Sequence, residues 1–325
     1  MDTFYNAGVA FVAWIQSLGA WLVGPMQFFS FFGSGTFFLL LLPVMYWCVD
    51  VGFALQLGAI MLFSSAINGT LKLVFHAPRP YWFSTKVTAY AGEPTFGIPS
   101  GHSQNAVVLF GTAAVLLKRR WFWLLAIFFI IMIGFSRMYL GVHFSQDVLT
   151  GWAIGALILW GMANWWKPVK TWAISKSLVQ QIWLAFALSV ILLLCGAAAY
   201  APLIGWNMPA EWMTNALQAG MGTPPMPVTM DNTITSAAAL FGLLAGVAWI
   251  QSRGGYDPRG SLGQKALRLL PGLLGLLIFY FGLGLIFPKD AMLIAFALRY
   301  LRYALVGAWV SAGAPWLFQK LKLAG

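Results

Sequence analysis

Apolar residues occur along this chain in long runs, and short polar or basic segments separate one run from the next. A helix needs about 20 mostly apolar residues to cross the hydrocarbon core of a bilayer. By that measure the pattern predicts an all-α fold, a polytopic membrane helix bundle with about nine transmembrane helices. The predicted spans lie at residues 33–50, 52–74, 102–118, 121–138, 146–166, 178–200, 232–250, 269–287 and 293–317.

The N-terminal stretch differs from these runs. Residues 3–23 carry apolar side chains at helical spacing, but Asn6, Gln16 and Ser17 interrupt them. This pattern predicts an interfacial helix, with a tenth span as the alternative. We expect three parts: an interfacial N-terminal helix at 1–32, a catalytic core at 33–170 and a C-terminal transmembrane bundle at 171–325. In the bundle, small residues at 236–246 favour close helix packing.

The composition supports a membrane setting, because 60% of the residues are hydrophobic, 8% are charged and the mean hydropathy is +0.79. A net charge of +11 would suit a nucleic-acid partner, but the lysines and arginines gather in short loops, so we expect none. Cys48 and Cys195 lie inside apolar segments and are interpreted as buried hydrophobes. Membrane lipids are the expected surroundings, and nothing in the sequence indicates an obligatory protein partner.

The basic loops predict the orientation in the membrane. Loops at 118–120, 167–176, 253–268 and 320–322 emerge on one face, which the positive-inside rule makes cytoplasmic. The polar runs described next then lie on the opposite, extracytoplasmic face. The expected location is the bacterial cytoplasmic (inner) membrane, with the functional face toward the periplasm or exterior. Two longer loops, at about 75–101 and 201–231, lie on that face, and the second could cover a site there.

Three short polar runs interrupt the apolar chain: residues 72–80 (KLVFHAPRP), 99–102 (PSGH) and 136–147 (SRMYLGVHFSQD). A charged side chain in a transmembrane helix costs roughly 2.5 to 3.5 kcal/mol, so these residues are functional candidates. Lys72, Arg79 and Arg137 can neutralise the non-bridging oxygens of a phosphate, which is most of what phosphoryl transfer requires. Ser100 and Gly101 begin a predicted helix, where a hydroxyl and main-chain amides can face an anion.

His143 and Asp147 are four residues apart, which places them one turn apart on one face of a helix. Asp147 can accept a hydrogen bond from one ring nitrogen of His143 and leave the other free as a nucleophile. His102, on a different loop, is suited to protonate the leaving oxygen and then to activate water. Each residue alone has a structural explanation, such as an interfacial anchor, but together they indicate a phosphate-cleaving site.

At these residues the chain resembles the type 2 phosphatidic acid phosphatase (PAP2) superfamily. The family pattern is Lys, six residues, Arg-Pro; then Pro-Ser-Gly-His; then Ser-Arg, five residues, His, three residues, Asp, and the chain fits it within about residues 50 to 165. The resemblance implies that His143 forms a phosphohistidine, that Asp147 orients it and that His102 is the acid and base. It also implies that the phosphate is held without a metal or other cofactor, by Lys72, Arg79, Ser100, Gly101 and Arg137.

The nine-span layout is similar to the glucose-6-phosphatase and sphingosine-phosphate phosphatase branches of that family, more than to its six-span bacterial lipid phosphatases. Several residues outside the pattern stay open. Arg299 and Arg302, inside the last predicted span, could bind a second phosphate or a lipid headgroup, or could lie at the interface. His76 is expected to have a local structural role. Lys86 and Glu93 are expected to be solvated, with contact to a lipid headgroup as the alternative.

The expected function is a metal-independent membrane phosphatase that hydrolyses a lipid phosphate or pyrophosphate through a phosphohistidine at the extracytoplasmic face. Undecaprenyl pyrophosphate, phosphatidylglycerol phosphate and phosphatidic acid are the candidate substrates. The alternatives are a phosphotransferase with a lipid or sugar acceptor, and a phosphatase for a sphingoid or sugar phosphate. A non-enzymatic transporter or scaffold is disfavoured because the residue set is intact.

Overall fold

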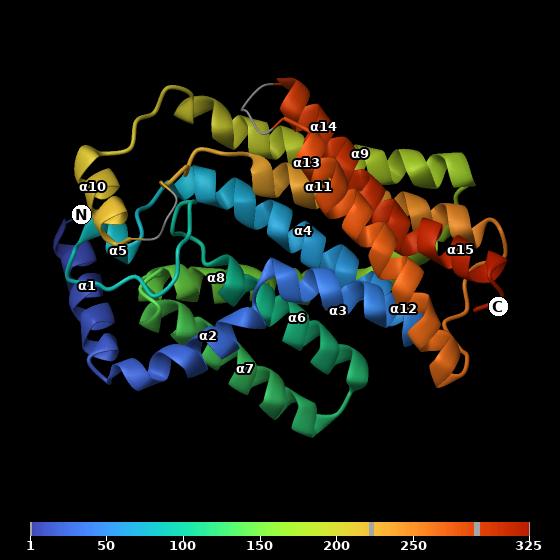
Figure 1. Cartoon of the computed structure of the whole chain (residues 1–325), viewed down its shortest axis with the longest axis horizontal. Coiled ribbons are helices and arrows are strands. Elements are labelled where there is room, and N and C mark those ends of the chain that lie inside the picture. The colour runs from blue at the N-terminus through green and yellow to red at the C-terminus, as the bar shows by residue number, and fades with distance from the viewer. Residues whose placement is uncertain (1, 221–223, 289–292, 325) are drawn as a thin grey trace. The chain divides into compact units, whose positions relative to one another are not determined.

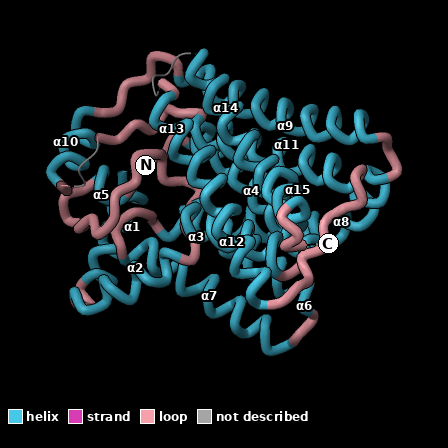
Figure 2. Tube along the Cα trace, turned by 45° about the vertical axis from the view of Figure 1, so that its right-hand side comes forward, coloured by secondary structure: helices cyan, strands magenta, loops and turns pink. Residues whose placement is uncertain are grey.

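The computed structural model describes residues 2–220, 224–288 and 293–324. Within these ranges the regular structure is helical, without a strand, as the pattern predicts (Figures 1 and 2). The helices are α1 (Asp2–Gln16), α2 (Val23–Phe31), α3 (Gly35–Cys48), α4 (Val51–Phe75), α5 (Pro80–Phe83), α6 (Gly101–Leu117), α7 (Arg120–Tyr139), α8 (Ser145–Ile174), α9 (Leu178–Tyr200), α10 (Ala210–Gln218), α11 (Asp231–Gln251), α12 (Leu262–Leu277), α13 (Leu283–Ile286), α14 (Leu293–Ala308) and α15 (Ala314–Lys320).

Helices lie at all nine predicted ranges, but fewer of them are long and apolar enough to cross a membrane. Seven helical segments of the described chain meet that test: Val51–Phe83, Arg120–Tyr139, Ser145–Ile174, Leu178–Leu203, Asp231–Gln251, Leu262–Ile286 and Leu293–Lys320. Of the two others, α3 has 14 residues and α6 has 17. α6 also opens with four polar side chains at 102–105. The predicted count of nine full spans is therefore not confirmed.

The N-terminal stretch forms two helices instead of the single predicted helix at 3–23. The axes of α1 and α2 differ by 87°, and the two helices pass the membrane test only when taken together. Between them Gly19 has a φ of +113°, a backbone conformation that favours glycine. The predicted helix at 3–23 is therefore broken after Gln16, and its predicted place at the membrane interface stays a prediction.

The helices divide into two compact units, and each unit combines segments that are far apart in the sequence. The site unit contains residues 1–37, 67–160 and 196–230, and the companion unit contains residues 38–66, 161–195 and 231–325. All candidate residues from Lys72 to Asp147 belong to the site unit. Arg299 and Arg302 belong to the companion unit.

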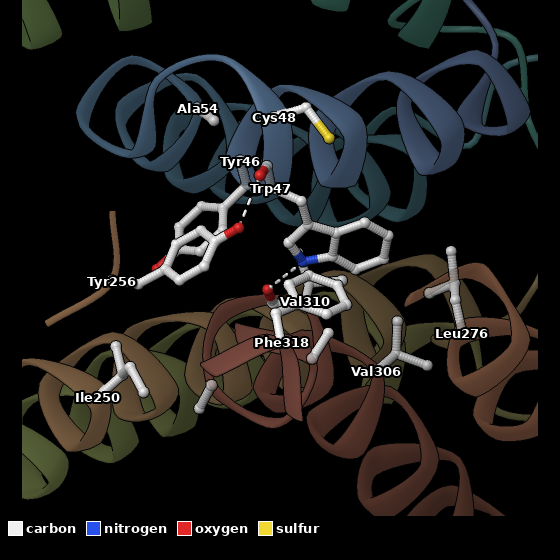
Figure 3. Packing of buried hydrophobic residues seen from close by; sticks show 12 residues of the cluster. Tyr46, Trp47, Cys48, Ala54, Ile250, Tyr256, Leu276, Val306, Val310 and Phe318 are labelled. Atoms are coloured by element: carbon white, nitrogen blue, oxygen red, sulfur yellow. Dashed lines mark hydrogen bonds between the residues drawn. The ribbon is translucent and has the colours of Figure 1, made fainter. Parts of the chain in front are cut away.

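Aromatic side chains form a core in the companion unit (Figure 3). The Trp47 indole donates a hydrogen bond of 2.8 Å to the Val310 carbonyl, and the Tyr256 hydroxyl donates one of 2.6 Å to the Trp47 carbonyl. The Tyr46 and Tyr256 rings lie parallel with centroids 6.2 Å apart, and Phe318 meets Trp47 edge-on. The polar ends of these large rings are thus satisfied within the core, as a structural role requires.

Helices α11 and α14 pack closely within the companion unit. A Cβ added at Gly242 would lie 1.9 Å from the Ala304 carbonyl oxygen, and one added at Gly307 would lie 2.3 Å from that of Ala239. The backbones approach to a distance that only glycine allows, so the close packing predicted for 236–246 is confirmed.

The two cysteines differ in their surroundings. Cys48 is buried, as predicted, whereas Cys195 is exposed. The prediction of burial is wrong for Cys195 because it shares an outward face of α9 with Ile191, which is 56% exposed.

Candidate active site

Lys72 and Arg79 lie at the two ends of the first polar run. Lys72 is in the last turn of α4, and its ammonium group donates hydrogen bonds to the Phe96 carbonyl and, at 3.4 Å, to the Gly97 carbonyl. Arg79 is the N-cap of α5, where Pro80 starts the helix. Both cations face the loop at residues 84–100, which leads from α5 to α6.

The Arg79 guanidinium joins this loop to the third polar run. It is 1% exposed, and its Nε donates to the Thr95 carbonyl at 2.6 Å. Its Nη2 donates to the Phe96 carbonyl at 3.0 Å, and its Nη1 donates to the Val142 carbonyl at 2.8 Å. Since Val142 precedes His143, one buried side chain aligns the first and third runs.

The second run lies against the third at the start of α6. The Ser100 amide donates to the Asp147 carbonyl at 2.9 Å, so the N-terminus of α6 is tied to α8. The Ser100 hydroxyl is buried and accepts hydrogen bonds from the amide and hydroxyl of Ser103, at 3.4 Å and 2.9 Å. Since a hydroxyl has one proton of its own, Ser100 keeps that proton for donation. A Cβ added at Gly101 would lie 3.0 Å from the Asn68 side-chain oxygen, which indicates a close approach of α6 to α4.

His143 lies between a carboxylate and a guanidinium. Its Nδ1 donates to Oδ2 of Asp147 at 3.1 Å, and its Nε2 accepts from Nη1 of Arg79 at 3.2 Å. The Phe144 amide also donates to Oδ2 of Asp147, at 3.0 Å, which fixes the carboxylate. These donors and acceptors assign the proton to Nδ1 and a lone pair to Nε2.

The surroundings keep the His143 ring neutral. Burial lowers the pKa of the imidazole well below its usual range, and the positive charges of Arg79 and Lys72 lower this pKa further. Nε2 of His143 is therefore unprotonated at pH 7, as a nucleophile requires.

Arg137 has a partner that the sequence pattern did not predict. Its Nη2 pairs with Oε1 of Glu93 at 2.5 Å, and its Nη1 donates to the Ser30 hydroxyl at 2.5 Å. The other carboxylate oxygen of Glu93 lies 3.8 Å from Nη2 of Arg79. The prediction that Glu93 is solvated is therefore wrong, because two arginines of the candidate site attract its carboxylate. The signal in the sequence is that Glu93 is the single acidic residue between Asp50 and Asp147.

The charge of Glu93 follows from these contacts. Burial alone would raise the pKa of the carboxyl group, but Arg137 and Arg79 outweigh that effect and lower the pKa to about 2. Glu93 is thus ionised at every physiological pH.

His102 is the second residue of α6 and is half-buried. A Cβ added at Gly33, in the turn between α2 and α3, would lie 3.0 Å from its Cβ. No residue of the described chain forms a hydrogen bond with its ring. Its imidazole is thus uncommitted, as a group that exchanges protons with a ligand requires.

Residues of the predicted covering loop, within the described ranges 201–220 and 224–230, contact α5 and the 84–100 loop. The Trp206 and Phe96 rings are in edge contact with centroids 5.4 Å apart, and the Met226 amide donates to the Pro94 carbonyl at 3.0 Å. The Asn215 side chain donates to the Trp82 carbonyl at 3.0 Å. This segment therefore supports the carbonyls that receive Lys72 and Arg79.

The remaining candidates have partners of their own. In the companion unit, Arg299 forms an ion pair of 2.7 Å with Asp231, and Arg302 donates to the Tyr303 hydroxyl at 2.8 Å. His76 has a φ of +35° and its ring contacts Phe96 edge-on, which agrees with a local structural role.

Comparisons with protein families point to one superfamily. The sequence model of the PAP2 superfamily matches residues 53–172, a range that includes all three polar runs. The chain contains a PAP2 superfamily domain. A second model, described as the transmembrane extension of PAP2 superfamily phosphatases, matches residues 234–325. With its apolar helices, this PAP2 chain is an integral membrane protein.

Individual relatives differ in sequence identity and in how much of each chain the match covers. This PAP2 chain is 31% identical to lipid phosphate phosphatase delta of Arabidopsis thaliana, over 47% of this chain and 41% of that protein. It is 35% identical to undecaprenyl-diphosphatase of Sulfolobus acidocaldarius, over 27% of this chain and 42% of that protein. The match to glucose-6-phosphatase 3 of Bos taurus has 24% identity and covers 98% of this chain and 96% of that protein. The chain thus spans about two fifths of the first two relatives, and the predicted likeness to the glucose-6-phosphatase branch is confirmed.

Proposed function

We propose that this PAP2 protein is a membrane phosphatase that hydrolyses a lipid phosphate or pyrophosphate through a phosphohistidine on His143. The observation that carries the proposal is the position of the ring, with Asp147 on Nδ1 and the Arg79 guanidinium on Nε2. The nitrogen with the lone pair thus faces a cation that would hold the phosphate. In this proposal, the other phosphate-binding groups are Lys72, Ser100, Gly101 and Arg137.

In the first step, Nε2 of His143 attacks phosphorus, and the bond from phosphorus to the leaving oxygen breaks. The leaving oxygen keeps the electron pair and takes a proton from His102. Asp147 stabilises the positive charge that develops on the His143 ring, while the arginines and the lysine stabilise the charge on the equatorial oxygens.

In the second step, water attacks the phosphorus of the phosphohistidine. His102, now neutral, accepts a proton from that water, and the bond from nitrogen to phosphorus breaks with its electron pair returning to Nε2. Inorganic phosphate leaves, and both histidines have regained their starting protonation. One water molecule is consumed in each cycle.

The orientation of the site unit supports an extracytoplasmic site. α6 runs from Ser100 to the basic turn at 118–120, and α7 returns from that turn to Arg137. The basic turn and the candidate residues are therefore at opposite ends of the same two helices. The positive-inside rule puts the turn in the cytoplasm and the site outside. We propose the periplasmic side of a bacterial inner membrane.

The surface of α1 supports a substrate with a lipid tail. The Tyr5 ring packs on Phe83 and Phe144 with centroids 5.1 Å and 5.3 Å away, so this helix lies beside the candidate site. On the same helix Phe4 and Trp14 are each 61% exposed. An apolar surface next to the polar site suits the chain of a lipid phosphate.

A sugar phosphate is the second candidate substrate. The match to glucose-6-phosphatase 3 of Bos taurus favours it, because that match extends over nearly all of both chains. The phosphoenzyme step would be the same, and only the leaving group would differ. A phosphotransferase would also share this step but would need an acceptor other than water.

The test is phosphate release by the detergent-purified full chain, with the variant His143→Ala as the blank. The panel contains undecaprenyl pyrophosphate, phosphatidylglycerol phosphate, phosphatidic acid, a sphingoid phosphate and glucose 6-phosphate. We expect release from at least one lipid substrate by the wild type alone. Release from glucose 6-phosphate alone would favour the sugar-phosphate function, and release that needs an added acceptor would favour a transferase. Equal rates in the wild type and the variant would refute the proposal.

A further inference from the structure

Glu93 holds a position between two cations of the candidate site. One of its carboxylate oxygens pairs with Nη2 of Arg137 at 2.5 Å, and the other lies 3.8 Å from Nη2 of Arg79. The two arginines are 3% and 1% exposed, whereas the Glu93 side chain is 25% exposed. A carboxylate that uses both oxygens to reach two guanidinium groups has the same contacts that a phosphate would make there.

The charge of the site is opposite in sign to that of its proposed ligand. Lys72, Arg79 and Arg137 contribute three positive charges, and Glu93 and Asp147 contribute one negative charge each, which leaves +1 around the proposed phosphate position. A phosphate monoester has a charge of about −1.5 to −2 at pH 7. Glu93 therefore reduces the positive charge available to the ligand, and its carboxylate competes with the ligand for the same donors.

Glu93 is attached in a way that lets its side chain move alone. Its main chain is fixed by the Tyr81 hydroxyl, which accepts from the Glu93 amide at 3.1 Å and donates to the Glu93 carbonyl at 3.0 Å. Its carboxylate has no main-chain partner in the described residues. Rotation about the side-chain bonds of Glu93 would therefore free Arg137 without any movement of the 84–100 loop.

The chemistry of the carboxylate limits what it can do. With a pKa of about 2, Glu93 carries no proton at neutral pH, so it has none to give to a leaving group. Its remaining effects are to compete with anions and to orient the arginines. If Glu93 competes with anions, removal of its charge should strengthen phosphate binding. If it orients the arginines, removal of its charge should weaken phosphate binding.

We propose that Glu93 is an internal competitor for the phosphate site, an anion that substrate and product must displace from Arg137. This inference rests on the proposed function, because it concerns the same phosphate site. A site that is available for only a tenth of the time binds about tenfold more weakly than its intrinsic affinity. Glu93 thus weakens binding of substrate and helps to expel the phosphate product from the arginines.

The experiment compares Glu93→Gln with the wild type, using the full chain in detergent. The dissociation constants of inorganic phosphate and orthovanadate are measured by titration calorimetry, and KM and kcat are measured with the lipid substrate on which the wild type is active. Glu211→Gln is the matched control, because Glu211 is the other glutamate of the chain and is exposed on α10 of the site unit. Glu93→Asp is a second variant, which keeps the charge but is too short to reach both arginines.

We expect Glu93→Gln to bind phosphate and orthovanadate about tenfold more tightly than the wild type, with a lower KM and a lower kcat set by slow product release. Glu93→Asp should show a smaller shift in the same direction, and Glu211→Gln should show none. Unchanged or weaker phosphate binding in folded Glu93→Gln, or in folded Glu93→Asp where Glu93→Gln does not fold, would overturn the inference and leave the phosphatase intact. Absence of both turnover and anion binding in the wild type would instead overturn the proposed function, and this inference with it.

Discussion

Arg137 in the site unit and Arg268 in the companion unit are both buried, but they use their donors in opposite ways. Arg268 donates five hydrogen bonds, and all of its acceptors are main-chain carbonyls, those of Trp47, Pro258, Arg259 and Leu323. Arg137 donates to two side chains, those of Ser30 and Glu93. Its buried Nε has no hydrogen-bond partner among the described residues.

The difference separates a structural arginine from one that can bind a ligand. Main-chain carbonyls cannot rotate away as side chains can, so an arginine whose donors are all used by them is fixed. A buried donor without a partner costs about 1 to 3 kcal/mol, which is tolerated where a ligand can supply the missing acceptor. Burial alone therefore does not identify a functional arginine. Arg79 also donates to main-chain carbonyls, and what marks it as a candidate is its contact with His143.

The largest effect is expected from loss of the proposed nucleophile, which lies in the site unit. Replacing the nucleophile in His143→Ala should lower kcat by about 10⁴-fold or more, because the phosphoenzyme cannot form. The variant should still fold, with a lower midpoint of thermal unfolding, because Asp147 and Arg79 each lose a buried hydrogen bond. Phosphate release from the best lipid substrate is the measurement, with size-exclusion chromatography as the control for folding. Residual activity above a tenth of the wild type would exclude His143 as the nucleophile.

The next effect is expected at Asp147. Asp147→Asn keeps the size of the side chain but removes the charge that orients and stabilises the His143 ring. We expect kcat to fall by roughly 10² to 10⁴-fold with little change in KM. Steady-state kinetics separates the two parameters. A change confined to KM would mean that Asp147 acts on substrate binding instead.

The two arginines should respond in opposite ways to the same substitution. Arg137→Lys replaces a planar fork with a point charge, so kcat/KM should fall by about 10 to 10³-fold while stability changes little. Arg268→Lys cannot reach all the carbonyls that Arg268 serves, and each unmet carbonyl costs about 1 to 3 kcal/mol. We therefore expect a clear fall in the unfolding midpoint of this variant, with kcat per folded molecule retained.

Thermal unfolding and kinetics on both variants decide whether this distinction holds. Loss of kcat in Arg268→Lys that is still folded would show that the companion unit takes part in catalysis. A large loss of stability in Arg137→Lys would show that Arg137 also supports the fold.

A smaller effect is expected from pH. Only the neutral His143 ring is a nucleophile, and its pKa is lowered by burial and by Arg79 and Lys72. Lowering the pH from 7.5 to 6.5 should therefore not protonate His143, and protonation should reduce the rate only well below pH 6.5. The measurement is kcat/KM against pH, corrected for the second ionisation of the substrate phosphate near pH 6. A loss centred near pH 6.5 after this correction would mean that the His143 ring is solvated.

Local sequence patterns predicted the elements whose causes are local. The apolar runs gave the positions of helices such as α9 and α11, because helix formation and burial in lipid depend on neighbouring residues. The spacing of His143 and Asp147 predicted their hydrogen bond, but the prediction that both lie on one helix was wrong. His143 lies in the loop before α8, and Asp147 lies in the first turn of α8. The left-handed Gly19 between α1 and α2 was missed, because a single glycine does not by itself mark a bend in an apolar stretch.

Contacts that depend on distant parts of the chain were not predictable in the same way. Glu93 meets Arg137 only because the 84–100 loop returns toward α7, and Ser30 meets it because α2 lies beside α7. Neither contact joins two residues of the same helix, so the spacing of residues along a helix does not predict it. The charge pattern offered a weaker signal, a lone acid in a loop between two basic runs, which is compatible with a solvated residue as well as with an ion pair.

The smallest expected effect is that of metal chelators. The proposed site neutralises its phosphate dianion with three cations, Lys72, Arg79 and Arg137. A divalent cation there would meet three fixed positive charges, which oppose its binding. We therefore expect the rate of phosphate release to be the same in EDTA and in its absence, with the substrate kept in excess of its KM. Inhibition by EDTA that a divalent ion reverses would refute this charge balance and assign part of the neutralisation to a metal.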